Sequence, residues 1–316
     1  MTPARKKAGP LAPAARVRET ARILVIGDVM TDVVVRPEGP LARGSDRRAT
    51  IRFEPGGSAA NQAAWIAAFG VAVDFVGRVG AADVEAESAR LAAAGVTPHL
   101  AGDPERPTGR LVALIDRAGE RSFFTDRGAN EALSADDIPG ALIEGAALVH
   151  LSGYSFFAPT PRAAVIDVMC RAGARPVSVD PASAEFLREV GPQNFLDWTR
   201  GAAVLMPNAD EAEVLAGSAD PEIQCVRLSA NYPLVVIKRG ADGCLAAEGA
   251  RRWTVEAPEA QAIDTTGAGD AFAAAFLAAR LKGAAIEPAL RSAVAAGAKA
   301  ATKIGGRPGA ADLRSN

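Results

Sequence analysis

The stretch DTTGAGD at residues 264–270 runs directly into the apolar stretch AFAAAFL at residues 271–277. Glycines placed just before an apolar run predict a tight turn that leads into a helix. The first N–H groups of such a helix have no partner within it, and the helix dipole places partial positive charge there. We therefore expect the backbone of this turn to bind an anion such as a phosphate.

Asp270 would stand beside that anion, where a carboxylate is useful as a proton acceptor. The helix dipole favours the ionised form of Asp270, so we expect a weak base. Phosphoryl transfer tolerates a weak base because its loose transition state depends mainly on positioning and charge stabilisation. With the amides of Gly267, Ala268, Gly269 and Asp270 as an anion hole, the segment indicates a phosphotransferase acting on an alcohol. An ordinary glycine-rich turn before an acidic first helical turn would leave the same pattern.

Two other phosphate-binding patterns do not occur. The chain contains no Gly-x-x-x-x-Gly-Lys-[Ser/Thr] segment, and no Gly-x-Gly-x-x-Gly follows a predicted strand. The pair Gly267 and Gly269 lacks the third glycine of a dinucleotide-binding turn and comes late in the chain. A Walker-type loop and a dinucleotide site are therefore excluded.

Upstream of this segment, predicted strands and helices alternate. Short apolar runs predict buried strands at 23–26, 73–76, 147–151, 176–180, 204–206 and 234–238. Helices are predicted at 58–69, 84–94 and 161–172, and from Asp270 and Pro288 onward. The alternation predicts an α/β fold with a doubly wound, mainly parallel sheet flanked by helices, and ligands bound beyond the carboxyl ends of its strands.

Residues 33–53 and 108–127 break this alternation and are typical of β ribbons, the second turning at residues 117–120. Such hairpins need a surface to pack on. We expect them to form a small, discontinuous β-sheet lid that excludes water from a site beneath it.

A second glycine motif, PGGSAANQAA at residues 55–64, has Gly70 and Gly80 downstream. With this spacing it resembles the N-terminal signature of the ribokinase-like sugar kinases, the PfkB carbohydrate kinase family, and residues 264–270 resemble that family's C-terminal signature. Two signatures in the right order are hard to obtain by chance. The resemblance spans about residues 22–310 and implies an ATP-dependent carbohydrate kinase with Mg²⁺ as cofactor and Asp270 as the catalytic base.

The resemblance also implies a sugar site at the N-terminal half of the chain. Asp32 follows the first strand and is similar to the family's sugar-gripping acid; a turn aspartate is the alternative. Asn61 and the backbone of Gly56 and Gly57 would contact another edge of the sugar, or Ser58 would simply cap a helix with Asn61 in its first turn. Asp28 is a further candidate for contact with the sugar, and a structural role is its alternative. Arg127, together with Arg110, would meet an acidic group of the substrate, or both would be solvated charges at the sheet edge. The segment 128–130 is similar to the end of the family's second lid portion.

On the nucleotide side, Asn208 and Glu211 match the family's Asn-x-x-Glu, which lies near Mg²⁺ and the ATP phosphates, with Glu211 reaching the metal through water. The same spacing is that of a helix start, with Asn208 as N-cap. Lys238, Gly240 and Gly243 belong to a loop that borders the nucleotide in the family, and a tight hairpin also accounts for the glycines.

Two further residues complete the metal candidates. Asp264 and Thr266 resemble a monovalent-cation site of ribokinase-type members, completed by backbone near residues 305–306. Many relatives lack this dependence on potassium, so K⁺ is a candidate rather than an expected cofactor.

Several residues depart from the ribokinase pattern. Ser58 replaces a lysine, and Met30 replaces an asparagine. The segment Leu151-Ser152-Gly153-Tyr154 stands where ribokinases place a sugar-binding glutamate. These losses put ribose itself in doubt and favour a hexose, a keto-sugar acid or a nucleoside. A nucleoside kinase of the same fold needs an aromatic platform for the base, for which the candidates are Phe53, Phe123 and Phe124.

A catalytically silent sugar-binding regulator is a further alternative. The intact Asp270 and both glycines of its turn argue against it, because a silent homologue need not keep the base.

The composition is that of a globular protein, with 49% hydrophobic and 23% charged residues among 316. The net charge of −2 argues against a nucleic-acid partner. The sequence has no uninterrupted run of about 18 apolar residues, which argues against a membrane partner. Three widely spaced cysteines without a CxxC favour a reducing cytoplasm.

The chain divides into a tail and one large unit. Residues 1–21, rich in Ala, Pro, Arg and Lys, are expected to form a flexible tail, with a transit peptide as the alternative. Residues 22–316 are expected to form a single kinase domain. By resemblance, its lid would be shared with a second subunit in a homodimer.

Overall fold

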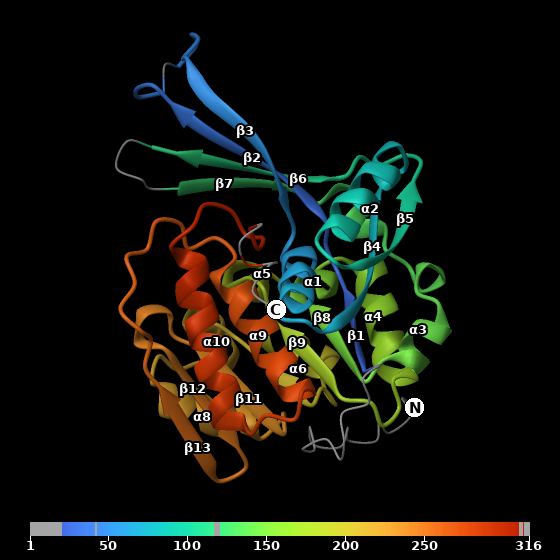
Figure 1. The fold of residues 1–316 in the computed structure, drawn as a ribbon, viewed down its shortest axis with the longest axis vertical. Coiled ribbons are helices and arrows are strands. Elements are labelled where there is room, and N and C mark those ends of the chain that lie inside the picture. Colours follow the sequence, from blue (N-terminus) through green and yellow to red (C-terminus); the bar gives the residue numbers. More distant parts are fainter. Residues whose placement is uncertain (1–20, 42, 117–120, 310–311, 313–316) are drawn as a thin grey trace.

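The computed structural model describes residues 21–41, 43–116, 121–309 and 312. The flexible tail predicted at the N-terminus and the hairpin turn predicted at 117–120 therefore lie outside the described residues, except for Ala21. Within these ranges the chain forms two sheets of different size, with helices around the larger one (Figure 1).

The large sheet has the strand order β13-β12-β11-β10-β9-β8-β1-β4-β5 among the described residues. Its neighbours are parallel from β11 to β5, and β12 and β13 add two antiparallel strands at one edge. This confirms the predicted mainly parallel, doubly wound sheet. The strands are β1 (Arg22–Ile26), β4 (Ala72–Gly80), β5 (Thr97–Asp103), β8 (Leu148–Ser152), β9 (Val177–Asp180), β10 (Val204–Leu205), β11 (Leu234–Lys238), β12 (Cys244–Glu248) and β13 (Arg251–Val255).

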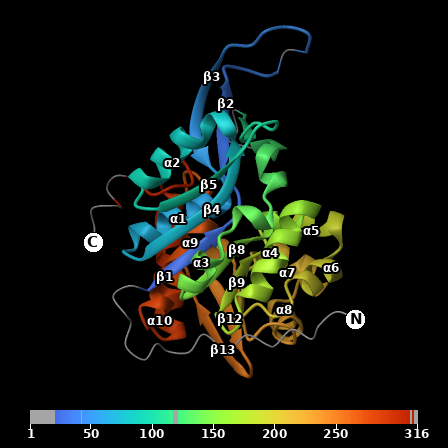
Figure 2. The same ribbon diagram turned by 90° about the vertical axis from the view of Figure 1, so that its right-hand side faces the viewer.

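Helices cover both faces of this sheet because its strands are apolar on both sides. In β1, Ile23 and Val25 pack into one core, with α1, α9 and α10, while Leu24 and Ile26 pack into the other. Figure 2 shows α1, α9 and α10 on one side and α3 to α8 on the other. The helices are α1 (Ser58–Ala68), α2 (Val84–Ala93), α3 (Gly140–Gly145), α4 (Pro159–Arg171), α5 (Ala184–Val190), α6 (Pro192–Trp198), α7 (Ala209–Ala216), α8 (Pro221–Ser229), α9 (Ala268–Leu281) and α10 (Ile286–Ala301).

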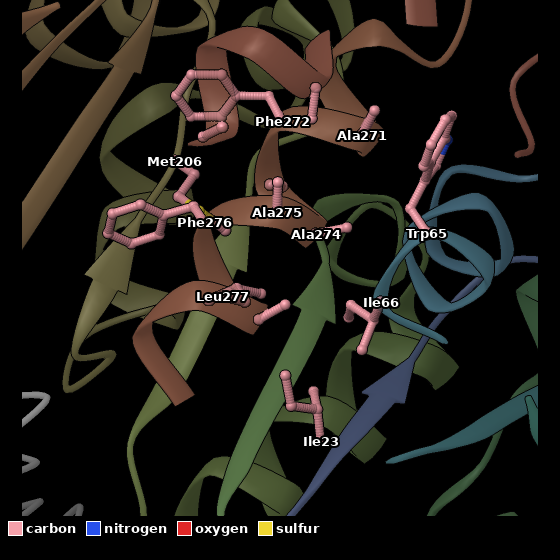
Figure 3. Packing of buried hydrophobic residues seen from close by; sticks show 14 of the residues in the cluster. Ile23, Trp65, Ile66, Met206, Ala271, Phe272, Ala274, Ala275, Phe276 and Leu277 are labelled. Atoms are coloured by element: carbon pink, nitrogen blue, oxygen red, sulfur yellow. The ribbon is translucent and has the colours of Figure 1, made fainter. Parts of the chain in front are cut away.

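Helix α9 is buried because its sequence is apolar almost all round. Phe272 and Phe276 lie beside Met206, and Leu277 lies above Ile23 of β1 (Figure 3). Its alanines allow α1 and α10 to approach closely. The tight packing fixes the first turn of α9, which carries the residues singled out from the sequence, at the edge of the large sheet where the parallel strands end.

The small sheet has the order β3-β2-β6-β7 and extends beyond the body of the molecule (Figure 1). Its strands are β2 (Met30–Pro37), β3 (Ala49–Gly56), β6 (Gly109–Ile115) and β7 (Arg121–Asp126). They confirm the predicted β ribbons, although β2 begins earlier and β3 ends later than residues 33–53. We call this sheet the lid.

None of the described helices is both long and apolar enough to cross a bilayer.

Candidate active site

The glycine turn predicted before helix α9 is formed, and anion binding by its amides stays a prediction. Gly267 is the N-cap of α9 with φ of 75°, and a Cβ there would lie 2.4 Å from Cα of Gly306, so only glycine fits. The N–H of Ala268 already donates to the carbonyl of Thr265 at 3.2 Å. Gly269 and Asp270 follow in the first turn, where a helix offers its N–H groups no internal acceptor.

Asp270 is held by three side chains from α1. Ser58 Oγ donates to its Oδ1 at 2.7 Å, Gln62 Nε2 to the same oxygen at 3.2 Å, and Asn61 Nδ2 to Oδ2 at 3.1 Å. Burial nevertheless raises the pKa of Asp270 to about 7, and the Asp180 charge adds to this, while the bonds from Ser58 and Asn61 oppose it. The expectation of a weak base was therefore wrong in direction, because desolvation outweighs the helix dipole at this site.

The sugar-side candidates gather at the lower end of the lid. A Cβ on Gly56 would lie 2.1 Å from Oδ1 of Asp32, so the Asp32 carboxylate lies against the Gly56 backbone. Burial, together with the nearby Asp28 charge, raises the pKa of Asp32 to about 6. Asn61, besides its bond to Asp270, accepts from Nε of Arg307 at 3.3 Å. Asp32, Gly56, Asn61 and Asp270 thus belong to one connected cluster.

Asp28 and Gly57 hold the start of α1. Asp28 is buried and accepts from the N–H groups of Ser58 and Ala59 and from Oγ of Ser152. Gly57 has φ of 93°, and a Cβ there would lie 2.5 Å from the Asp28 carbonyl oxygen. These contacts match the structural alternative for Asp28, and contact of Asp28 with substrate stays a prediction.

Arg127 lines a small cavity next to Asp28. Its Nη2 is 3.5 Å from Oδ2 of Asp28, and its guanidinium stacks 4.1 Å from the centre of the Tyr154 ring. The cavity, of about 160 Å³, is also lined by Phe157 and Phe186, whose rings contact that of Tyr154. An aromatic surface therefore lies next to Asp28, outside the lid that contains the predicted candidates Phe53, Phe123 and Phe124.

A cavity of about 710 Å³ is lined both by the nucleotide-side candidates and by the turn at Gly267. Its polar end contains Asn208, Glu211, Lys238 and Asp270. Its apolar end is formed by the loop after β13 and by α9 and α10, with Ala257, Pro258, Phe272, Val294, Gly297, Ala298 and Ala301 among the lining residues. The structure thus brings together every residue predicted to bind the nucleotide, since Gly240 and Gly243 line the same cavity.

Asn208 and Glu211 form the predicted helix start. Asn208 Oδ1 accepts from the Glu211 N–H at 2.8 Å, and Glu211 Oε2 accepts from the Asn208 N–H at 2.8 Å, a capping box. Burial raises the pKa of Glu211 to about 7, an effect that the positive charge of Lys238 opposes. The structural alternative is therefore confirmed, and Glu211 still lines the cavity.

Lys238 lines the cavity and pairs with Asp180. The distance from Lys238 Nζ to Asp180 Oδ2 is 2.6 Å, and both side chains are nearly buried. Lys238 ends β11, and β12 returns antiparallel after residues 239–243, so the predicted tight connection between two strands is confirmed.

Asp264 accepts hydrogen bonds from two loops, the one before α9 and the one that contains Gly305. Its Oδ1 accepts from the Thr266 N–H at 2.8 Å, and its Oδ2 accepts from the Gly305 N–H at 3.2 Å. Asp264 thus lies beside Gly305, as the sequence resemblance implied. In the part of the chain that the structure describes, no group of three or more His, Cys, Asp or Glu side chains could hold a metal ion.

Four residues of this site were missed in the sequence. Asp180 ends a buried strand, so its place at the carboxyl edge of a sheet was a usable signal. Gln62 directly follows Asn61, and His150 is an ionisable residue inside the apolar β8. Nothing in the local sequence distinguishes Arg307, which also donates to the Gly56 carbonyl at 3.1 Å.

Comparisons with known proteins agree with this fold. The model of the pfkB family carbohydrate kinases matches residues 20–312. An ATP-dependent ribose-1-phosphate kinase from Halopiger xanaduensis is 33% identical over 293 residues, covering 90% of this chain and 94% of the relative. The chain belongs to the PfkB carbohydrate kinase family.

Solved structures show the same fold. Adenosine kinase from Sinorhizobium meliloti superposes with a TM-score of 0.84 at 23% identity, covering 93% of this chain and 98% of the neighbour. A putative ribokinase II from E. coli in complex with ATP and Mg²⁺ has a TM-score of 0.80 at 25% identity, covering 90% and 94%. The protein is thus a ribokinase-like sugar kinase, a phosphotransferase with an alcohol as acceptor.

Proposed function

We propose that the protein transfers the γ-phosphoryl group of ATP to a hydroxyl of a sugar or sugar-like acceptor bound beneath the lid. The single observation that carries this proposal is the continuity between the 710 Å³ cavity and Asp270, whose carboxylate also contacts the sugar-side residue Asn61. One acid thus lies at the junction of a nucleotide-sized cavity and the lid-covered cluster.

In this mechanism the acceptor hydroxyl gives its proton to Asp270 as its oxygen attacks the γ-phosphorus. The bond from that phosphorus to the oxygen bridging the β- and γ-phosphates breaks, and ADP leaves with the electron pair. A pKa of about 7 suits Asp270 to this task, since a base near neutrality is both ionised and able to accept a proton. The amides at Gly269 and Asp270 and the Lys238 ammonium face the charge that builds up on the phosphates.

Mg²⁺ fits the polar end of the cavity. Mg²⁺ keeps much of its water and is commonly held by substrate phosphates with one or two carboxylates, which supplies charge neutralisation during transfer. Glu211 is the acid that lines this end, and its raised pKa means that a cation there would favour its ionised form. Potassium at Asp264 and Thr266 remains a proposal supported by the closeness of Asp264 to Gly305.

The acceptor is proposed to carry an acidic group, such as a phosphate. Arg307 belongs to the sugar-side cluster, and within the described ranges it makes hydrogen bonds to two neutral acceptors, Asn61 Oδ1 and the Gly56 carbonyl. Burial lowers the pKa of Arg307, and the negative charges of Glu87 and Asp32 oppose this shift. The ribose-1-phosphate substrate in the name of the Halopiger relative supports the same class.

A nucleoside is the second candidate acceptor. The cavity beside Asp28, lined by Tyr154, Phe157 and Phe186, is an aromatic surface on which a base could stack. It favours a nucleoside over a plain pentose, whereas Arg307 favours a phosphosugar.

We also propose a homodimer formed through the outer face of the lid. Cross-strand pairing places Phe53, Val33, Val112 and Phe124 in one row across the four strands, on the face opposite Asp32. Phe53 and Phe124 are 72% and 64% exposed. An apolar sheet face of this kind is typical of a protein–protein interface.

The test is ADP release from Mg²⁺-ATP with a panel of sugars, sugar acids, phosphosugars and nucleosides. We expect turnover with one class, and a phosphosugar would also support the role of Arg307. Absence of turnover across the panel, with ligands still raising the melting temperature, would favour the silent sugar-binding regulator instead.

A further inference from the structure

His150 is buried in β8 and takes no part in the roles described so far. Its side chain has no exposed surface, and both ring nitrogens have partners. Nδ1 lies 2.7 Å from Oγ of Ser178 in β9, and Nε2 lies 2.6 Å from Oε1 of Gln62 in α1. Burial lowers the pKa of His150 to about 4, so the ring is neutral and carries a single N–H.

The hydrogen bonds determine where that proton lies. Oε1 of Gln62 can only accept, so Nε2 of His150 must carry the hydrogen, and Nδ1 accepts from the Ser178 hydroxyl. The Gln62 amide is thereby oriented with its oxygen toward His150. Its NH₂ group then points the other way, with Nε2 3.2 Å from Oδ1 of Asp270 and 3.3 Å from Oδ2 of Asp180.

Both N–H bonds of Gln62 are therefore directed at carboxylates. The opposite orientation of the Gln62 amide would place Oε1 against two carboxylates and leave the His150 N–H facing an NH₂ group. The neutral His150 ring therefore selects one of the two amide orientations of Gln62. Lys238 is a further charged side chain next to these carboxylates, and it pairs with Asp180.

The two oxygens of Asp270 are left in unequal surroundings. Among the described residues, Oδ1 accepts from both Ser58 and Gln62, whereas Oδ2 accepts from Asn61 alone. A carboxylate oxygen has room for about two such bonds. The remaining capacity of Oδ2 is on the side of the cluster that contains Asn61, where the acceptor is proposed to bind.

We propose that His150 is a positioning residue: by fixing the Gln62 amide, it holds Asp270 with Oδ2 directed at the acceptor hydroxyl. This inference rests on the proposed kinase function. His150 touches neither substrate, and its effect reaches the reaction only through Gln62.

The test compares two substitutions of equal polarity. An asparagine amide can take the place of the ring Nδ1, and a glutamine amide can take the place of Nε2. His150→Asn therefore keeps a partner for Ser178 but loses the donor to Gln62, whereas His150→Gln keeps that donor. We expect His150→Asn to lower kcat by about tenfold or more with an unchanged KM for ATP, and His150→Gln to recover most of the loss.

A matched control separates positioning from stability. Thr199 Oγ1 and the Tyr232 hydroxyl form a buried hydrogen bond of 2.6 Å that has no contact with the site. Thr199→Val should lower the melting temperature and leave kcat unchanged. The proposal is overturned if His150→Asn stays within twofold of wild type, if His150→Gln is equally impaired, or if Thr199→Val loses kcat in proportion to its stability.

A measurement without turnover distinguishes failure of this inference from failure of the proposed function. The Asp270 carboxyl can be titrated by ¹³C NMR in the wild type and in His150→Asn. Loss of an oriented donor to the carboxylate should raise the pKa of Asp270 in the variant, and His150→Gln should restore it. An unchanged titration overturns the inference even if the enzyme is active, and a shifted one supports it even if no acceptor has been found.

Discussion

Ser58 Oγ donates a hydrogen bond of 2.7 Å to Oδ1 of Asp270, joining the first turns of α1 and α9. Ser58 stands where ribokinases carry a lysine. A neutral hydroxyl stabilises the carboxylate less than a cation would, which is consistent with the raised pKa of Asp270.

Ser58→Ala should therefore raise the pKa of Asp270 further, because a bond to its ionised form is lost. We expect the acid limb of the kcat/KM profile to move to higher pH, with a loss of about tenfold at pH 7, as for one charge-assisted hydrogen bond. Ser58→Thr keeps the hydroxyl and serves as the control. Identical pH profiles for the alanine variant and wild type would show that this bond does not tune the base.

Substitutions in the ion pair of Lys238 and Asp180 should affect protein stability and ATP affinity differently. Lys238→Met leaves Asp180 nearly buried without its ion-pair partner, which typically costs about 3–5 kcal/mol of unfolding free energy. Adding Asp180→Asn removes the uncompensated charge, so the double variant should regain much of that stability in urea unfolding. ATP affinity, measured by titration calorimetry, should be lower than that of wild type in both the single and the double variant. Wild-type ATP binding by the double variant would exclude Lys238 from phosphate recognition.

The raised pKa of Asp270 also predicts how stability depends on pH. The pKa of Asp270 is about 7 in the folded state, above its ordinary value of 3.8. Between these two pH values the folded state therefore keeps a proton on Asp270 that the unfolded state has lost. The stability due to this group is complete below about pH 4, falls as pH rises, and levels off above pH 7. Relative to Asp270→Asn, wild type should lose on the order of 1–2 kcal/mol between pH 5 and pH 7.5, discounted for the partial exposure of the carboxylate. A melting-temperature difference that is constant over this range would contradict the shift.

The outer face of the lid predicts an oligomeric state. Phe124→Lys places a charge in the apolar row, so the mass from light scattering should fall from that of a dimer to that of a monomer. Phe123→Lys, on the opposite face of the same strand, is the matched control and should leave the mass unchanged. A wild-type protein that is monomeric at micromolar concentration would exclude the lid interface.

The elements that were predictable from sequence are those with local signals. The glycine turns before α1 and α9, the apolar run of β1 and the capping box at Asn208 each depend on residues close together in the chain. The two lid ribbons were also recognisable, but not that β2 and β6 would pair in parallel.

The rest depends on residues that are distant in sequence. His150, Gln62 and Asp180 meet only because β8 and β9 are neighbours beneath α1. Their hydrogen bonds leave no pattern in any one segment. The pKa of Asp270 was misjudged for the same reason, since the helix dipole is visible in the sequence whereas burial by α1 is not.

The central claim is that Asp270 accepts the proton of the acceptor hydroxyl. It is tested most directly by kcat of Asp270→Asn on the acceptor found in the panel, with acceptor binding measured separately by calorimetry. We predict a loss of about 10²–10⁴-fold in kcat, with binding of the acceptor changed little. Turnover within about tenfold of wild type would contradict the assignment of Asp270 as the base.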